Sequence, residues 1–210
     1  MTNDKIQMTN KSKKSKSRKS LVIGLTGPIA SGKSEVAKML GRYGALVIDA
    51  DEIGHQIMLP QKKVWHEIVK AFGVKVLNRG GKINRKKLAK IVFSDRSTLK
   101  KLNRIMHPEM KSVINGMARQ SNRKLVIVNA AVLVEMGLLP LVEKVIVVLA
   151  SEKVRIRRLM RAGIPRADAI ARIRSQAGAS GYRKIADIVV MNDGSIGELR
   201  KKVKRIIAEL

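Results

Sequence analysis

The chain has 210 residues, 45% of them hydrophobic, with a net charge of +28 and no cysteine. This length suits one domain with a small insert or lid, and the lack of cysteine excludes disulfide bonds and thiolate metal sites and favours a reducing cytoplasm. No apolar run approaches the ~20 residues that a membrane-spanning helix needs. The charge has two explanations: a solvated basic surface, or a polyanionic partner such as nucleic acid or another anionic surface.

The first twenty residues are polar, rich in lysine and low in complexity, so we expect residues 1–20 to form a disordered basic tail. They hold seven lysine and arginine residues and one aspartate, a net charge of +6, so most of the charge lies in the body of the chain. Aromatic residues make up only 2% of the chain, too few for the stacking platforms that bind single-stranded nucleic acid.

Apolar runs and helical patterns alternate from residue 21 onward. LVIGLT (21–26) is typical of a buried strand, and a glycine loop and a helix with an apolar face at 36–40 follow it. ALVI (45–48) is a second short strand that ends in acidic residues. Apolar residues at helical spacing then dominate residues 59–120, which we interpret as a mostly helical insert.

The second half of the chain returns to strands. KLVIVNA (124–130) and EKVIVVLA (143–150) are continuous apolar runs, as in strands covered on both faces. An arginine-rich helical stretch follows, broken at 163–165, and then a short strand and an amphipathic helix over 197–210. This alternation predicts an α/β fold with a parallel sheet.

The stretch GPIASGKS fits the pattern G-x-x-x-x-G-K-[ST] between a predicted strand and a predicted helix. Glycines let backbone N–H groups face one centre, and the helix N-terminus adds the positive end of its dipole. In such a loop the lysine reaches the β and γ phosphates and the final hydroxyl ligates Mg²⁺. We therefore expect ATP to bind here, at Gly27, Pro28, Ile29, Ala30, Ser31, Gly32, Lys33, Ser34 and Glu35.

A phosphate loop does not identify the acceptor, because ATPases, GTPases and small-molecule kinases share it. The chain has no convincing Asn-Lys-x-Asp stretch of the kind that reads guanine. The apolar strand of a motor ATPase typically ends in aspartate, whereas LVIVN ends in Asn129. A body of this size with a helical insert and an arginine-rich segment indicates a kinase of small metabolites.

Two acids, Asp49 and Asp51, follow the second predicted strand. Residues two apart in a strand project to the same side, and the carboxyl end of a parallel strand faces the ligand crevice. The pair could therefore hold the Mg²⁺ shell and receive a proton from an acceptor hydroxyl. The alternative is a turn that caps a helix beginning near Glu52, because aspartate is a good N-cap.

The stretch GLTGPIASGKSEVAKMLGRYGALVIDADEIGHQIM (24–58) resembles the start of the dephospho-coenzyme A kinase family, which pairs a GLTGGIGSGKS-type loop with a VIDAD-type strand end. Further similar stretches follow in the family's order: NRIMHPE (103–109), VNAAVLVEMGL (128–138), RRLMRAG (157–163), ARIRSQ (171–176) and KIADIVVMNDGS (184–195). Together they extend the resemblance over residues 21–210.

This resemblance implies a P-loop-type parallel sheet of about five strands flanked by helices, with 21–26 as the central strand. Within a kinase domain over 21–210, residues 59–120 would form the acceptor-binding insert and residues 151–185 the lid. The implied reaction is ATP- and Mg²⁺-dependent phosphorylation of the ribose 3′-hydroxyl of dephospho-coenzyme A, the last step of coenzyme A biosynthesis.

The resemblance also implies residue roles. Asp51 would be the general base or orienting acceptor for the 3′-hydroxyl, and Asp49 and Ser34 would act through the metal. Lys33 would neutralise the β and γ phosphates. Arg157 and Arg161, four apart on one helical face, would close over the donor phosphates, unless they belong to a solvated basic face.

Three more residues have an implied role and a simpler alternative. His107 would touch the acceptor, or it marks a helix end before Pro108. Glu135 would contact the acceptor or the nucleotide site, or it is an acid at a helix N-terminus. Asn192 would lie at the adenine of ATP, or it belongs to a plain turn. Arg174 and Gln176 are weaker lid candidates.

The chain departs from the family pattern at a few positions. Pro28 and Ala30 replace glycines in the loop, and Ala131 replaces a proline ahead of Glu135. His55 stands where arginine is commoner. Two alternative functions are another nucleoside or nucleotide kinase of the same fold, and a basic nucleic-acid-associated P-loop protein, whose binding would weaken steeply with salt.

Overall fold

The structure is a computed structural model that describes residues 20–176 and 178–210. The predicted basic tail lies outside the described residues except for Ser20. That residue contradicts the predicted boundary, because it is buried and its hydroxyl donates to the carbonyl oxygens of Arg123 at 2.7 Å and Ser121 at 3.3 Å. Ser20 is therefore part of the folded body.

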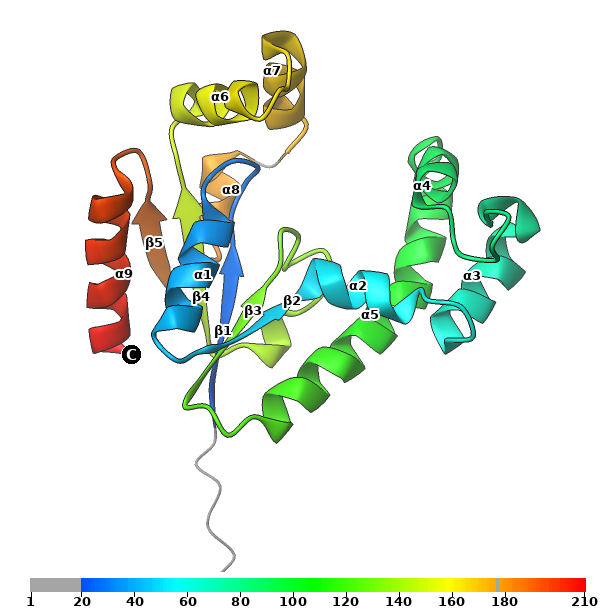
Figure 1. Ribbon diagram of the computed structural model, residues 1–210, viewed down its shortest axis with the longest axis horizontal. Coiled ribbons are helices and arrows are strands. Elements are labelled where there is room, and N and C mark those ends of the chain that lie inside the picture. Colours follow the sequence, from blue (N-terminus) through cyan, green and yellow to red (C-terminus); the bar gives the residue numbers. More distant parts are fainter. Residues whose placement is uncertain (1–19, 177) are drawn as a thin grey trace, which may run out of the picture.

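The centre of the molecule is a parallel sheet of five strands in the order β2-β3-β1-β4-β5. The strands are β1 (Leu21–Thr26), β2 (Leu46–Asp49), β3 (Leu125–Asn129), β4 (Lys144–Leu149) and β5 (Ile188–Met191). The predicted parallel sheet with 21–26 at its centre is confirmed. Because every strand points the same way, the residues that follow β1, β2 and β3 meet at one edge (Figure 1).

Helices fill most of the remaining chain. They are α1 (Lys33–Arg42), α2 (Ala50–Ile57), α3 (Lys63–Phe72), α4 (Arg85–Phe93), α5 (Arg96–Gln120), α6 (Glu152–Arg161), α7 (Arg166–Arg174), α8 (Ala179–Arg183) and α9 (Ile196–Glu209), with 3₁₀ turns η1 (Val74–Val76) and η2 (Leu139–Leu141). In the part of the chain that the structure describes, none of these helices combines the length and the apolar character needed to cross a bilayer.

The two faces of the sheet bury separate apolar clusters because side chains alternate along a strand. On one face, Ile23 and Leu25 of β1 pack with apolar residues of α1 and α9. On the other face, Val126 and Val128 of β3 join a larger cluster that includes Leu133 and continues into α2 and the inner side of α5. The sheet is thus covered on both sides, as the continuous apolar runs predict.

Two helical segments extend from this core. The arm, which we define as residues 63–120, comprises α3, η1, α4 and α5 and projects away from the sheet (Figure 1). Helices α6 and α7 lie beyond the carboxyl ends of the strands (Figure 1). They are separated at residues 162–165, where the sequence predicted a break, and they pack on each other through Leu159, Ala169 and Ile173.

Candidate active site

The phosphate loop connects the end of β1 to the first residue of α1, Lys33, at the carboxyl edge of the sheet. Gly32 precedes the helix with a left-handed φ of +97°, and a Cβ atom there would lie 2.0 Å from Nδ2 of Asn192. A Cβ atom on Gly27 would lie 2.3 Å from the carbonyl oxygen of Val148. Both glycines are therefore required by close packing as well as by the turn. The loop lies between a strand and a helix, as the motif requires.

The side chain of Lys33 is connected through an amide to the second strand. Nζ of Lys33 donates to Oδ1 of Asn129 at 2.6 Å, and Nδ2 of Asn129 donates to Oδ2 of Asp49 at 2.7 Å. Burial lowers the pKa of the Lys33 ammonium, while Asp51 and Asp49 act in the opposite direction. The hydrogen bonds among Lys33, Asn129 and Asp49 therefore fix the position of the Lys33 ammonium beside the loop.

The two acids do not share a strand face. Asp49 ends β2 and caps α2, because its Oδ1 accepts hydrogen bonds from the backbone N–H groups of Asp51 at 3.0 Å and Glu52 at 3.2 Å. Asp51 lies in the first turn of α2. The argument from strand spacing was therefore wrong, and the capping alternative is confirmed for Asp49. Both carboxylates nevertheless lie near Lys33, because α2 starts where β2 ends.

A small cavity of about 260 Å³ lies beside the loop and is lined by Ser34, Asp49 and Asn129 among others. A hydroxyl and a carboxylate facing one space are oxygen donors of the kind that Mg²⁺ prefers. Among the described residues no cluster of three or more His, Cys, Asp or Glu side chains could hold a metal by itself. The donor set therefore fits an ion that takes part of its coordination from phosphates and water. The side chain of Glu35 pairs with Lys38 at 3.2 Å on the surface of α1, and contact of this residue with the nucleotide stays a prediction.

Two arginines of α6 contact the loop directly, and they are not the predicted pair. Arg158 donates to the carbonyl oxygens of Ala30 at 3.1 Å, Ser31 at 3.0 Å and Asn192 at 2.9 Å. Arg155 donates from Nε to the carbonyl oxygen of Ile29 at 2.8 Å.

The predicted pair lies elsewhere. Arg157 and Arg161 are exposed and line a separate cavity of about 670 Å³ between α6 and α7, together with Lys153 and Arg166. Contact of this pair with the donor phosphates stays a prediction.

Asn192, which follows β5, belongs to the loop's support. It is 6% exposed, and its Nδ2 donates to the carbonyl oxygen of Ser31 at 2.8 Å. Its backbone N–H donates to the carbonyl oxygen of Leu149, the last residue of β4, at 2.7 Å, and this bond fixes Asn192 beside the end of that strand. Gln176 also reaches the loop, because its Oε1 accepts from the backbone N–H of Ile29 at 2.8 Å, whereas Arg174 is exposed on α7.

A third cavity, of about 630 Å³, brings together His107 and Glu135 with the basic residues Lys100, Arg104 and Lys111. His107 does not end a helix, since α5 continues through Pro108 to Gln120. Burial, helped by Lys111, lowers the pKa of His107.

Glu135 lies on the turns between β3 and η2, not at a helix N-terminus. The start of this turn is fixed despite Ala131, whose carbonyl oxygen accepts from the Thr26 hydroxyl at 3.3 Å. His55, on α2, lies against Nη1 of Arg85 at the base of the arm.

Sequence reasoning missed Asn129, Arg155 and Arg158 as site residues. The position of Asn129 directly after four apolar residues of β3 was a usable signal, because parallel strands end at the ligand edge. Arg155 and Arg158 are three apart and so share one face of α6, but the two other arginines of this helix hide that pattern.

Phosphate loops occur in ATPases, GTPases and kinases, and the rest of the site separates these classes. Here two carboxylates stand beside the loop lysine, and a basic cavity opens against the arm. Such a site provides for a phosphate donor and for a second, anionic molecule. The fold and the site therefore define a P-loop kinase of small molecules.

The comparisons with known proteins narrow this class to one family. The family model described as dephospho-CoA kinase matches residues 21–198. A dephospho-CoA kinase of Aquifex aeolicus is 40% identical over 189 residues, which is 90% of this chain and 96% of the relative. A dephospho-CoA kinase of Carboxydothermus hydrogenoformans is 38% identical over 190 residues, which is 89% of this chain and 92% of the relative. This chain belongs to the dephospho-CoA kinase family.

Solved structures agree with this assignment. A dephospho-CoA kinase from Campylobacter jejuni, 28% identical, superposes with a TM-score of 0.67 over 90% of this chain and 96% of its own. A crystal structure from Thermus thermophilus, 33% identical, reaches 0.78 over 91% and 98%. A shikimate kinase from Bacteroides thetaiotaomicron, 15% identical, reaches 0.53 over 90% and 99%, and this likeness shows the fold alone.

Proposed function

We propose that this enzyme transfers the γ-phosphoryl group of ATP to the ribose 3′-hydroxyl of dephospho-coenzyme A, giving coenzyme A and ADP. The observation that carries the proposal is the hydrogen-bonded series Lys33–Asn129–Asp49 beside the phosphate loop, with Asp51 in the first turn of the next helix. This arrangement supports an acceptor hydroxyl held between a carboxylate and a phosphate-binding cation.

Each of these residues has one step in the proposed reaction. Asp51 is exposed, and its carboxylate orients the 3′-hydroxyl and takes its proton as the oxygen–phosphorus bond forms. The bond from the γ-phosphorus to the bridging β-γ oxygen breaks, and Lys33 stabilises the negative charge on the ADP that leaves. Asn129 keeps the Lys33 ammonium directed toward the loop.

Ser34 and Asp49 would hold Mg²⁺, because their oxygen atoms share the cavity beside the loop. When bound, the ion would neutralise charge on the β and γ phosphates. One carboxylate oxygen of Asp49 already accepts hydrogen bonds from the start of α2, and the other accepts one from Asn129. The position of the carboxylate is therefore fixed before any ion binds.

We further propose that the acceptor lies in the cavity lined by His107 and Glu135. Its basic residues Lys100, Arg104 and Lys111 suit the diphosphate of dephospho-coenzyme A, and His107 with a lowered pKa offers a neutral hydrogen-bonding group. The arm (α3–α5) is then the acceptor-binding insert, and α6–α8 form the lid. Location in the cytoplasm stays a prediction from the cysteine-free sequence.

The variant Asp51→Asn tests the proposed base. We expect its kcat for acceptor-dependent ADP release to fall by about 10²–10⁴-fold, the range typical of general-base loss, with little change in ATP affinity. Glu52→Gln is the matched control, because Glu52 is the next acid of α2 and its carboxylate pairs with Gln56. An Asp51→Asn enzyme as active as the Glu52→Gln enzyme would show that Asp51 is not the base.

A further inference from the structure

The phosphate loop contains one non-glycine residue in the left-handed region. Ala30 has φ of +59°, a conformation that costs a residue with a Cβ atom free energy because of the clash with the following carbonyl oxygen. Such a residue persists only where its surroundings hold it in place. Arg158 contacts the carbonyl oxygen of Ala30 itself at 3.1 Å, and a second set of contacts acts on its neighbour Ile29.

Ile29 is hydrogen-bonded on both sides of its backbone by the lid. Nε of Arg155 donates to the carbonyl oxygen of Ile29 at 2.8 Å, and the Ile29 N–H donates to Oε1 of Gln176 at 2.8 Å. The same Gln176 oxygen accepts from Nη2 of Arg155 at 3.3 Å, which closes the ring of contacts. Arg155 lies on α6 and Gln176 just beyond α7, so two separate segments of the lid take part.

These contacts are partly shielded from water. Arg155 is 9% exposed, and Ile29 and Ala30 pack against the apolar cluster formed by Leu159, Ala169 and Ile173 between α6 and α7. Two nitrogen atoms of its guanidinium are already engaged, Nε by the Ile29 carbonyl oxygen and Nη2 by Gln176. Arg155 therefore acts on the shape of the loop.

We propose that Arg155 and Gln176 are positioning residues that hold Ile29 and Ala30 in the turn required for phosphate binding. The loop and the α6–α7 lid then form one unit, and nucleotide affinity depends on contacts that lie outside the phosphate site. The proposal rests on the proposed function only in that the loop binds ATP. It assigns no role to the acceptor, so it is tested without one.

The test is the dissociation constant of Mg²⁺·ATP, measured by calorimetry on the whole protein without acceptor. We expect Arg155→Met to raise the dissociation constant about tenfold. Without Arg155 the loop must hold Ala30 in its left-handed conformation when the nucleotide binds, and the free energy of that conformation corresponds to about a tenfold change in affinity. Gln176→Leu should act in the same direction. Arg172→Met is the matched control, because Arg172 is an exposed arginine on α7, and its dissociation constant should stay at the wild-type value.

The decisive variant is Ala30→Gly, since glycine adopts left-handed φ values without the clash. In the Ala30→Gly background, the effect of Arg155→Met should shrink from about tenfold to about threefold or less. A merely structural role for Arg155 would lower the melting temperature and weaken binding equally in both backgrounds. That result, or wild-type affinity in Arg155→Met, would overturn the proposal. Failure of the kinase assay with normal ATP binding would instead count against the proposed function.

Discussion

Asn129 ends β3 and is 4% exposed, and its amide joins Lys33 to Asp49 through contacts of 2.6 and 2.7 Å. An amide suits this position because it accepts from the ammonium with one atom and donates to the carboxylate with the other. An aspartate here would place a third carboxylate against Asp49. The residue type that argued against a motor ATPase thus has a defined function in the site.

We predict that Asn129→Leu, which is close in volume but has no polar atoms, lowers kcat by about 10–100-fold, because Lys33 loses its fixed position. The free energy of unfolding should fall by about 1–3 kcal/mol, since the half-buried ammonium loses its acceptor. Steady-state kinetics and urea unfolding measure the two effects. Unchanged kcat with the expected stability loss would mean that the Lys33–Asn129 bond is structural only.

At the scale of elements, the sequence predicted the strands and the sheet well. Continuous apolar runs such as 125–129 and 144–149 are long enough to identify buried strands without further information. The break between α6 and α7 was also visible, because Gly163 and Pro165 interrupt the helical pattern.

The candidate site was predicted less completely, for reasons of geometry. Strand and helix meet between Asp49 and Ala50, and spacing alone does not tell which period governs Asp51. Pro108 suggested a helix end, but α5 continues through it. The proline removes one backbone hydrogen bond, and the free energy gained by burying Met110 and Ile114 exceeds the free energy lost with that bond. The choice among the arginines of α6 depends on where the lid packs, which is tertiary information.

The continuous α5 presents His107 to the cavity that we propose for the acceptor, and this predicts a pH dependence. Its folded-state pKa is below the unfolded value of about 6.5, so the unfolded chain binds the proton more tightly. The associated stability is complete above pH ~6.5 and is lost as the pH falls toward the folded pKa. Between pH 7 and pH 5 the free energy of unfolding should therefore fall more in the wild type than in His107→Gln. Identical pH slopes would contradict this placement of His107.

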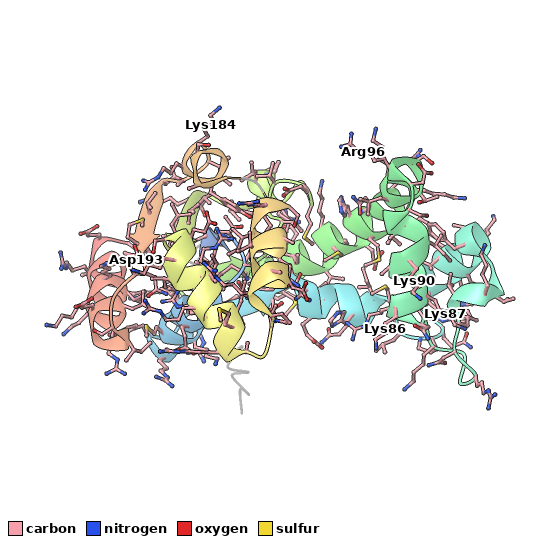
Figure 2. All side chains as sticks on the ribbon, turned by 90° about the horizontal axis from the view of Figure 1, so that it is seen from above. Lys86, Lys87, Lys90, Arg96, Lys184 and Asp193 are labelled. Atoms are coloured by element: carbon pink, nitrogen blue, oxygen red, sulfur yellow. The ribbon has the colours of Figure 1, made fainter. Side chains whose placement is uncertain are left out.

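At the scale of the whole molecule, the positive charge is distributed unevenly. The arm, residues 63–120, holds 15 lysine and arginine residues and three acidic ones, a net charge of +12. Figure 2 shows three of them, Lys86, Lys87 and Lys90, projecting from α4 on the arm. Among the described residues there are two ion pairs, and their basic partners are Lys38 and His55, both outside the arm. The arm is therefore a strongly positive surface beside the cavity proposed for the acceptor.

This charge should attract an anionic acceptor over a distance that salt shortens. We predict that kcat/KM for dephospho-coenzyme A falls about fivefold or more from 50 to 300 mM salt, while kcat changes little. Stopped reactions at fixed ATP measure both. If kcat/KM did not change with salt, the positive charge would be explained by a solvated basic surface and not by attraction of the acceptor. Binding of duplex nucleic acid with a steep salt slope would favour the nucleic-acid partner.

The measurement that tests the central claim most directly is identification of the product by mass spectrometry, after incubation of the purified protein with ATP, Mg²⁺ and dephospho-coenzyme A. The account predicts a product one phosphoryl group heavier than the acceptor, one ADP formed for each, and no product from an acceptor that lacks the ribose 3′-hydroxyl. ADP release that ignores the acceptor, or phosphorylation of the 3′-deoxy compound, would contradict the proposed reaction.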